Sequence, residues 1–397
     1  MNKQPELFFV TGELSGDIHA AGLARELAGM ADVRLTGAGG PHMRQAAVAT
    51  DFDSTNWGTI GLPQAIRKIP YLLLQKKRIV NMVKQRQPAL LILIDFGAFN
   101  VRLARTVRRA CPGQRIMYYF PPSSWRRRPH DWSFLAELVD IIATPFKWSA
   151  QQLRNCGVTA HWVGHPVVDR FSDQQDAADF RRQQNLPDGD PVVGLMPGSR
   201  NVERNCIGPQ LLAAAKLLHS KLPEAQFLWS ALSEAQPSKL DQRAVAADHI
   251  TPLADSRSLI LASDIVLTAS GTATLEATAA LRPLIMVYRG TLAMQIQARF
   301  MDFGTDYFAM PNIIAQRRIV PELIQNEVNP QRLCQEVLDL HNSKSRQEQM
   351  KQQLAEVRAE LGAPGAARRA AQLALTFVAD QEQLSSVPAT ASGEALQ

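Results

Sequence analysis

Several common signatures of function are missing from this chain of 397 residues. No apolar run is long enough to span a bilayer, and the chain passes from Met1 into the apolar run 7–10 without the pattern of a signal peptide. Its four cysteines include no CxxC pair, so we expect reduced thiols in place of a disulfide framework or a zinc site. These cysteines are Cys111, Cys156, Cys206 and Cys334. Together the absences predict a cytoplasmic protein.

Sequence signatures for nucleotide cofactors and metals are also absent. The chain has neither the GxGxxG fingerprint nor the GxxxxGK[ST] phosphate loop, which disfavours NAD and ATP chemistry. Its eight histidines form no HxH or HExxH arrangement. Segments 51–53 and 188–190 have the DxD spacing of some metal-dependent transferases, but the second has the composition of a turn. We predict no metal site and no cofactor, with DxD coordination as the alternative.

Apolar runs and helical stretches alternate along the chain. With 397 residues, of which 46% are hydrophobic and 20% charged, the chain exceeds the usual size of a single core and should form two domains. A polar stretch at 172–190 separates the two alternating halves, and the second begins at Pro191. In the first half the apolar runs 7–10, 89–94, 115–119 and 139–144 predict buried parallel strands. The pattern predicts an α/β fold with two Rossmann-like halves.

The segment 269–276 combines small, hydroxyl-bearing residues with a carboxylate one helical turn later. The apolar run 264–268 predicts a buried strand, and helix formers follow from 274, so residues 270–272 should lie at a helix N-terminus. Free backbone N–H groups and the helix dipole favour a pyrophosphate there, and Glu276 could accept hydrogen bonds from ribose hydroxyls. The alternative is that Ser270 or Thr272 only caps the helix. The donor-binding residues predicted here are Ser270, Gly271, Thr272, Thr274 and Glu276.

A second loop of this kind, at 195–200, follows the apolar run 191–194. Gly198 lets a backbone approach an anion closely, and Ser199 can donate a hydrogen bond. Arg200 offers a planar, permanently charged fork for phosphate oxygens. Because two loops can hold the two ends of one diphosphate, the pair predicts a nucleotide-sugar site.

Positive charge is concentrated in one segment of a chain whose formal net charge is +6. No acidic residue lies between Asp53 and Asp95, where basic and large apolar residues alternate. This composition suits an anionic membrane surface, whereas a solvated helix with a core-facing stripe is the alternative. No nucleic-acid-binding motif accompanies the segment, so we expect no nucleic-acid partner. The predicted membrane-facing residues are Trp57, Leu62, Ile69, Leu72, Leu73, Lys76, Lys77 and Arg78, extended by Trp125 and Arg128.

In their order along residues 6–375, eleven motifs resemble the lipid-A-disaccharide synthase family. In the first half they are TGELSGD (11–17), GAGGPHM (37–43), IGLP (60–63), LIDFGAFN (93–100), YFPPSSWRRR (119–128) and GHPVVD (164–169). In the second half they are PGSR (197–200), SGTATLEA (270–277), PLIMVYR (283–289), MPNIIA (310–315) and VPELIQ (320–325). The resemblance implies a glycosyltransferase of the GT-B type, with two Rossmann-like domains facing a central cleft.

The resemblance also implies a reaction and a location. The donor would be UDP-2,3-diacylglucosamine and the acceptor 2,3-diacylglucosamine 1-phosphate, joined by an inverting β(1→6) transfer without metal at the cytoplasmic face of the inner membrane. Domains at 1–170 and 171–362 follow, with a helix at 363–379 returning to the first domain by analogy with GT-B proteins. We expect the polar tail 380–397 to be disordered. A homodimer is compatible with the sequence.

Two carboxylates in the first half are the candidates for catalysis. Asp95 directly follows a predicted strand, and Glu13 lies in the loop after another, where open α/β sheets bind ligands. Asp95 matches the position proposed in the family for the base that deprotonates the attacking hydroxyl; the alternative is a polar residue satisfied at a strand end. Glu13 either orients the acceptor or holds its own turn. The resemblance adds Ser15 and Asn100 to the acceptor side and Asn312 to the donor side.

Three departures from the family pattern leave the acceptor open. Arg127 stands where a second tryptophan is expected, Arg318 falls in a segment that usually carries an acid, and Ala98 replaces a second aspartate. A divergent paralogue acting on another glycolipid is therefore an alternative. Two others are a UDP-sugar 2-epimerase on the same fold, which needs no lipid surface, and a non-catalytic binding relative.

Overall fold

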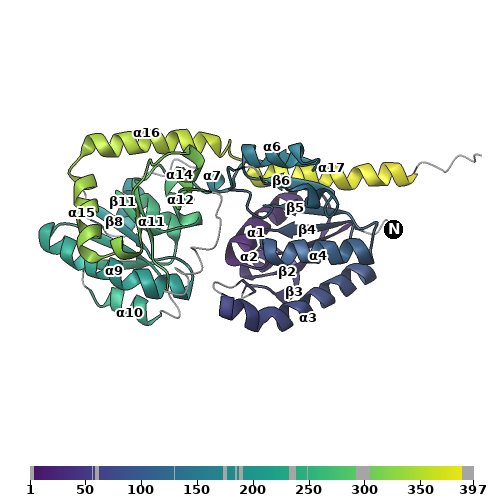
Figure 1. The fold of residues 1–397 in the computed structure, drawn as a ribbon, viewed down its shortest axis with the longest axis horizontal. Helices are drawn as coiled ribbons and strands as arrows, with labels where there is room; N and C mark the ends of the chain where they lie inside the picture. Colours follow the sequence, from purple (N-terminus) through teal and green to yellow (C-terminus); the bar gives the residue numbers. More distant parts are fainter. Residues whose placement is uncertain are drawn as a thin grey trace, which may run out of the picture.

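The protein is described from a computed structural model, in which two parallel sheets lie side by side (Figure 1). The described residues are 4–55, 57–58, 62–128, 130–172, 177–183, 186, 191–231, 238–247, 249–291 and 305–386. Each sheet is built by alternating strands and helices, so each forms a Rossmann-like unit.

The first unit is a seven-stranded parallel sheet in the order β3-β2-β1-β4-β5-β6-β7. Its strands are β1 Glu6–Val10, β2 Arg34–Gly39, β3 Ala49–Asp53, β4 Leu90–Ile94, β5 Ile116–Tyr119, β6 Ile141–Thr144 and β7 Ala160–Trp162. Its helices are α1 Leu14–Met30, α2 Pro41–Gln45, α3 Leu62–Arg86, α4 Gly97–Ala110, α5 Ser133–Ala136 and α6 Lys147–Asn155. Leu7 and Phe9 enter one core while Phe8 and Val10 enter another, because successive side chains point to opposite faces of the sheet. A strand covered on both faces therefore reads as a continuous apolar run.

The second unit is a six-stranded parallel sheet in the order β10-β9-β8-β11-β12-β13. Its strands are β8 Val192–Met196, β9 Gln226–Ser230, β10 Ile250–Leu253, β11 Ile265–Ala269, β12 Leu284–Tyr288 and β13 Glu322–Ile324. Its helices are α8 Ala177–Gln183, α9 Asn201–Lys221, α10 Lys239–Val245, α11 Ser256–Ala262, α12 Thr272–Ala279, α14 Met310–Ala315, α15 Pro330–His341 and α16 Lys344–Glu360, with a 3₁₀ turn at Gln325–Glu327. The two central strands of this sheet, β8 and β11, pair with each other. They are followed by the two loops expected to bind phosphate, 197–200 and 270–272.

The chain crosses between the units twice, and hydrogen bonds join the two crossings. The first contains α7, Val167–Arg170, and the second leads into α17, Ala366–Ser386. The His165 amide donates to the Leu361 carbonyl at 2.8 Å, and the Gly365 amide donates to the Asp169 carboxylate. Arg369 donates through Nε to the Val163 carbonyl at 2.8 Å. The junction between the units is therefore a double connection.

Helix α17 packs against α1 of the first unit and extends along it (Figure 1). Ala370, Ala371 and Ala374 are fully buried in the core that α1 also enters, since small side chains let two helices approach closely. The helix continues to Ser386, beyond the end at residue 379 that the sequence predicted for it. No glycine or proline interrupts the chain between residues 366 and 386. Residues 387–397 lie outside the described residues.

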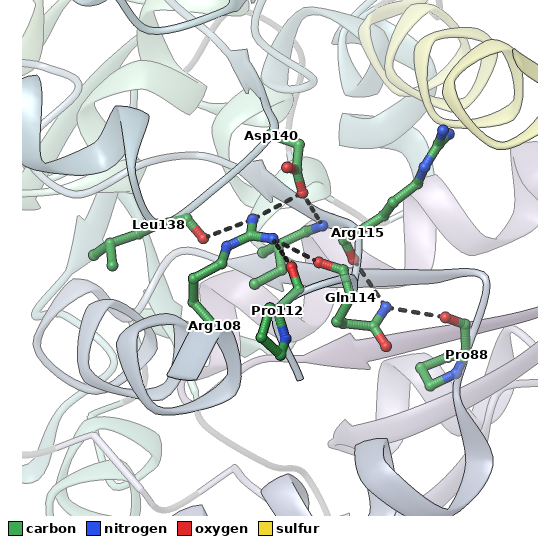
Figure 2. A network of polar contacts seen from close by, with 8 residues as sticks. Pro88, Arg108, Pro112, Gln114, Arg115, Leu138 and Asp140 are labelled. Atoms are coloured by element: carbon green, nitrogen blue, oxygen red, sulfur yellow. Dashed lines mark hydrogen bonds and ion pairs between the residues drawn. The ribbon is translucent and has the colours of Figure 1, made fainter. Parts of the chain in front are cut away.

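The N-terminal edge of the first sheet is closed by a polar network (Figure 2). Arg108 of α4 pairs with Asp140 at 2.9 Å, and Asp140 accepts a hydrogen bond from the Ile116 amide at 2.7 Å. The Arg108 guanidinium also donates to the carbonyls of Pro112, Gln114 and Leu138. The Gln114 amide reaches the Pro88 carbonyl at 2.9 Å. Backbone groups at this edge are thus satisfied internally.

Two residues predicted to face a membrane or acceptor lie inside the first unit. Trp57 is only 2% exposed and packs against Phe99, with ring centroids 5.3 Å apart, so that prediction is wrong. Asn100 is also fully buried. The cause is tertiary: the loop after β3 folds back over the sheet, where a large aromatic ring contributes most by filling the core. No helix in the described part of the chain is long and apolar enough to cross a bilayer.

Helix α3 divides the remaining predicted membrane-facing residues between surface and core. Ile69 and Leu73 are 49% and 51% exposed, and Tyr71 and Leu74 are similarly exposed. Leu72 packs partly against the core, whereas Ile79 and Val83 are buried within it. Lys77 and Arg78 are exposed and Lys76 is half-buried. The Leu62 side chain lies outside the described residues. The helix therefore has both a core-facing stripe and an apolar surface.

The contrast between Trp57 and Leu73 gives a stability prediction. Trp57→Ala should lower the free energy of unfolding by about 3–5 kcal/mol, because it removes a large buried ring and leaves a cavity. Leu73→Ala, the matched control, should change it by less than about 0.5 kcal/mol, because half of that side chain is already in water. Urea denaturation of both variants measures the difference. A loss of similar size in both would contradict the assignment of Trp57 to the core.

Candidate functional site

The loops at the C-terminal ends of the central strands of both units meet at the junction between the units. Glu13 follows β1 and Arg200 follows β8, and the Arg200 guanidinium pairs with the Glu13 carboxylate at 2.9 Å. Asp95 follows β4, and the Ser15 hydroxyl donates to its carboxylate at 3.4 Å. Residues from separate halves of the sequence are thereby assembled at the sheet edge where open α/β folds bind ligands.

Asp95 is held in an unusual backbone conformation. Asp95 and Phe96 have φ of +49° and +48°, in the left-handed region that residues other than glycine rarely adopt. Three hydrogen bonds hold the turn: the Asp95 amide donates to the Tyr119 carbonyl, and the Asp95 carbonyl accepts from Tyr118 Oη at 2.8 Å and Asn100 Nδ2 at 2.9 Å. Strain retained by surrounding contacts is typical of functional turns. Asn100 therefore supports Asp95 from inside the core and does not face an acceptor.

The surroundings of Asp95 raise the pKa of its carboxyl group to about 6. Burial is the largest cause, and the negative charge of Glu13 adds to it. The Phe96 amide, the Ser15 hydroxyl and the Arg200 charge oppose the rise. A carboxylate with a pKa near the working pH is suited to accept a proton during a reaction.

Glu13 reaches across the junction. It is the N-cap residue of α1, but its side chain makes no capping hydrogen bond and pairs with Arg200 of the second unit. Gly58 leaves room for it, since a Cβ on Gly58 would lie 2.5 Å from Glu13 Cγ. The reading of Glu13 as a residue that only holds its own turn does not fit these contacts. Asp17, in contrast, is buried and accepts hydrogen bonds from the Gly40 and His42 amides of the α2 turn.

The loop 197–200 is shaped by a positive φ at Gly198 and by an ion pair between Arg200 and Glu203. Gly198 has a φ of +100°, and a Cβ there would lie 2.7 Å from Glu203 Oε2. Ser199 and Arg200 are exposed, and Arg200 Nη1 also contacts Glu203 at 3.3 Å. Arg200 is therefore shared by two carboxylates, one from each unit.

Arg204 and Asp241 support this loop from behind, and sequence reasoning missed both. Arg204 is 2% exposed, pairs with the Asp241 carboxylate, and donates to the Gly198 and Ser230 carbonyls at 3.1 and 3.0 Å. Trp229 Nε1 donates to the same carboxylate at 2.8 Å. The one signal in the sequence was the position of Arg204, one helical turn after Arg200. Its partner Asp241 lies 37 residues further along the chain, where no local pattern could identify it.

The loop 270–272 begins α12, as expected, but its hydroxyl groups do not cap the helix. Gly271 is the N-cap residue with a φ of +122°, and no side chain caps this end. Ser270 donates to the Phe308 carbonyl at 2.8 Å. Thr274 is buried and donates to the Gly271 carbonyl at 2.7 Å, so it supports the loop from below. Gly271 and Thr272 are exposed at the positive end of the helix dipole.

Two further predicted donor residues lie in different surroundings. Glu276 is 8% exposed and forms an ion pair with Arg170 of α7. Asn312 is fully buried: its amide donates to the Val320 carbonyl and the Glu322 carboxylate, and its oxygen accepts from the amides of residues 319 and 320. Because all its hydrogen-bonding groups are used, Asn312 is not a donor contact, and we correct that prediction. It holds the loop before β13.

The basic segment near Trp125 contacts the second unit, and its assignment to a membrane surface stays a prediction. Trp125 packs partly against a core cluster that contains most of the buried residues of the second unit together with Phe146 of the first. Arg127 lies over the Trp148 ring, 3.7 Å from its centroid, and donates to the Ile314 carbonyl. Arg128 pairs with Asp306 at 2.7 Å. Docking of one unit on the other uses these side chains, and a linear pattern of charge does not reveal it.

Two other residues that depart from the family pattern, and the first of the two DxD segments, lie within the described residues. Arg318 donates to the Glu322 carbonyl at 2.9 Å, and Ala98 is exposed on the first turn of α4. In the first DxD segment, Asp51 pairs with Arg86 at 2.8 Å and Asp53 with Arg44 at 3.3 Å. The second, 188–190, lies outside the described residues. Among the residues that are described, no cluster of three or more His, Cys, Asp or Glu side chains could hold a metal ion.

Comparison with known proteins identifies relatives along nearly the whole chain. The model of a family described as lipid-A-disaccharide synthetase matches residues 7–377. The lipid-A-disaccharide synthase of Myxococcus xanthus is 33% identical over 382 residues, which cover 95% of this chain and 99% of that protein.

Solved structures show the same fold at low identity. The UDP-GlcNAc 2-epimerase from Neisseria meningitidis, bound to UDP-GlcNAc, has a TM-score of 0.65 at 12% identity, covering 94% of this chain and 100% of that one. CalG4, the calicheamicin glycosyltransferase, has a TM-score of 0.61 at 14% identity, covering 97% and 100%. The two Rossmann-like units are therefore arranged in the GT-B manner.

The pKa of Asp95 predicts how activity depends on pH. If ionised Asp95 is needed, kcat/KM should fall as the pH drops through about 6. Glu13→Gln removes a negative charge that raises the pKa of Asp95. The acid limb of the pH profile should therefore move to lower pH, even if the maximum value of kcat/KM also changes. Glu137→Gln, at an exposed position of the first unit, is the matched control and should leave the limb in place. If the acid limb of the Glu13→Gln variant stays at the wild-type pH, a group other than Asp95 controls the fall in kcat/KM.

Proposed function

This chain belongs to the lipid-A-disaccharide synthetase family, and from that premise we propose that it condenses UDP-2,3-diacylglucosamine with 2,3-diacylglucosamine 1-phosphate, releasing UDP. It is a glycosyltransferase of lipid A biosynthesis by family membership. The observation that carries the finer proposal is the meeting of Asp95, Glu13 and Arg200 at the junction of the two units. A base, an orienting carboxylate and an anion-binding cation lie together there.

Asp95 acts as the general base in the proposed reaction. It takes the proton from the acceptor's 6-hydroxyl group while that oxygen attacks the anomeric carbon of the donor. The bond from the anomeric carbon to the phosphate oxygen breaks, and its electron pair leaves with UDP from the opposite face. One bond forms as the other breaks, so the configuration at the anomeric carbon inverts.

Arg200 and the amides of residues 270–272 bind the departing diphosphate in this proposal. Negative charge develops on UDP as it leaves, and preorganised donors stabilise that charge. Arg200 is paired with Glu13 and Glu203 in the structure, so an arriving diphosphate competes for a guanidinium that is already in position. Because the Arg200 charge lowers the pKa of Asp95, its neutralisation by phosphate makes Asp95 a stronger base once the donor is bound. Glu13 is then freed to orient the acceptor.

The lipid substrates would reach this site over α3. The exposed apolar residues Ile69, Tyr71, Leu73 and Leu74 alternate with the exposed cations Arg67, Lys77 and Arg78. Lys68 donates to the Gly58 carbonyl at 3.4 Å, and Gly58 lies against Glu13. A surface suited to anionic lipid is thus connected to the candidate catalytic loop. This surface supports peripheral association with an anionic membrane and favours a lipid acceptor over a soluble one.

A substrate test separates the candidate activities. Purified protein should release UDP only when the diacylated UDP-glucosamine and the diacylglucosamine 1-phosphate are both present. Asp95→Ala should reduce turnover at least about a hundredfold, the lower range for a lost general base, while donor affinity changes little. Coupled detection of UDP and calorimetric binding of the donor measure the two effects. Turnover of UDP-GlcNAc without lipid would instead favour an epimerase, and equal loss of affinity and turnover would make Asp95 a scaffold residue.

A vesicle test addresses the membrane surface. Leu73→Glu/Leu74→Glu should weaken binding to vesicles containing anionic phospholipid by at least about tenfold, because two side chains that would enter the lipid become charged. The matched control, Gln349→Glu/Gln352→Glu, adds the same charge to exposed positions of α16 in the second unit. Co-sedimentation with the vesicles compares the two variants. Equal binding by both would place the membrane contact elsewhere.

A further inference from the structure

Arg170 contacts a predicted substrate-binding residue but has no part in the reaction described above. It ends α7, in the first crossing between the units, and its Nη1 pairs with Glu276 Oε1. Its Nη2 donates to the Ser256 hydroxyl at 3.4 Å and lies 3.9 Å from Asp255 Oδ1. The guanidinium thus joins the crossing to both α12 and α11.

The backbone that carries Arg170 is itself anchored to the second unit. Arg257 Nε donates to the Arg170 carbonyl at 2.6 Å, and Val167 and Val168 of α7 are buried in the core of the second unit. Helix α12, which carries Glu276, packs against α7. The ion pair therefore joins two helices that pack against each other, and the backbone on the Arg170 side is held by a hydrogen bond from the second unit.

We propose that Arg170 is a positioning residue that holds the Glu276 carboxylate ready to accept hydrogen bonds from the ribose hydroxyls of UDP. This inference rests on the proposed function, a transfer from a UDP-sugar, and on the prediction from the sequence that Glu276 accepts hydrogen bonds from ribose hydroxyls. An ionised carboxylate has two oxygens that only accept hydrogen bonds, and Arg170 occupies one of them, Oε1. The same charge compensates for the burial of the carboxylate, since an unpaired buried carboxylate would take up a proton or turn away.

The charged groups around Glu276 explain why the ionisation of its carboxyl group depends on Arg170. Burial raises the pKa of Glu276, and the nearby carboxylate of Asp255 adds to the rise. Arg170 and the Ser256 hydroxyl oppose it. His19 of α1 does not substitute for Arg170, because burial and then the Arg170 charge lower its pKa to about 4 and leave it neutral near pH 7. Without Arg170, the remaining charged group near Glu276 disfavours ionisation.

The test compares the binding of UDP and of 2′-deoxy-UDP to the full-length chain by calorimetry. The wild type should bind UDP about tenfold more tightly, as expected for a lost hydrogen bond to a charged group. Arg170→Gln should reduce this preference to less than about threefold, with partial recovery as the pH is raised and Glu276 ionises. Arg170→Lys keeps the charge and should retain most of the preference. Arg332→Gln, which removes an arginine from the buried Glu336 of α15, is the matched control and should behave as the wild type.

A double-mutant cycle distinguishes positioning from a general structural effect. Glu276→Gln should remove the ribose preference at every pH, and adding Arg170→Gln should then change UDP affinity little further, because the two residues act through one contact. Additive losses, or an Arg170→Gln variant that keeps the full preference, would overturn the proposal while leaving the proposed function intact. A wild type that binds neither nucleotide would overturn both. Equal thermal unfolding midpoints for the arginine variants confirm that folding is unchanged.

Discussion

The double crossing between the two units is the constraint on which the site depends. Each sheet can fold around its own core, but the candidate site exists only where the loops of one unit face those of the other. Hydrogen bonds from residues 163–171 to residues 358–369 tie the two crossings together, and α17 attaches the end of the chain to the first unit. In this arrangement the Arg200 guanidinium lies 2.9 Å from the Glu13 carboxylate across the junction.

Arginines control the carboxylates at this junction. Arg200 reaches from the second unit to Glu13 and lowers the pKa of Asp95, while Arg170 reaches from the crossing to Glu276. For Asp95 and for Glu276, burial raises the pKa of the carboxyl group and a nearby guanidinium opposes the rise. Ion pairs of this kind add little net stability, because desolvation offsets the attraction, but they define charge and orientation. The junction therefore holds cations beside buried carboxylates, and the function that we propose assigns a diphosphate to Arg200 and the role of base to Asp95.

The predictions that failed concern residues whose environment is set by distant parts of the chain. Trp57 occurs in a basic, apolar segment, yet it fills the core beneath a returning loop. Asn312 lies in a family motif, but its amide is used entirely within the protein. Arg204 and Asp241 had no visible signal, since their importance comes from being paired and buried together.

Local sequence determined the parts of this protein that depend on local physical rules. Continuous apolar runs predicted strands such as β1 and β4 because both faces of a central parallel strand are covered, and glycines marked the two turns that enter α9 and α12. The order of motifs predicted the family and the GT-B fold. Only the tertiary structure decided that Arg200 meets Glu13, that Arg170 meets Glu276, and which apolar side chains of α3 remain exposed. Each outcome depends on which residues far apart in the sequence come close together in the fold. Ion pairing and burial act only over such short distances in space.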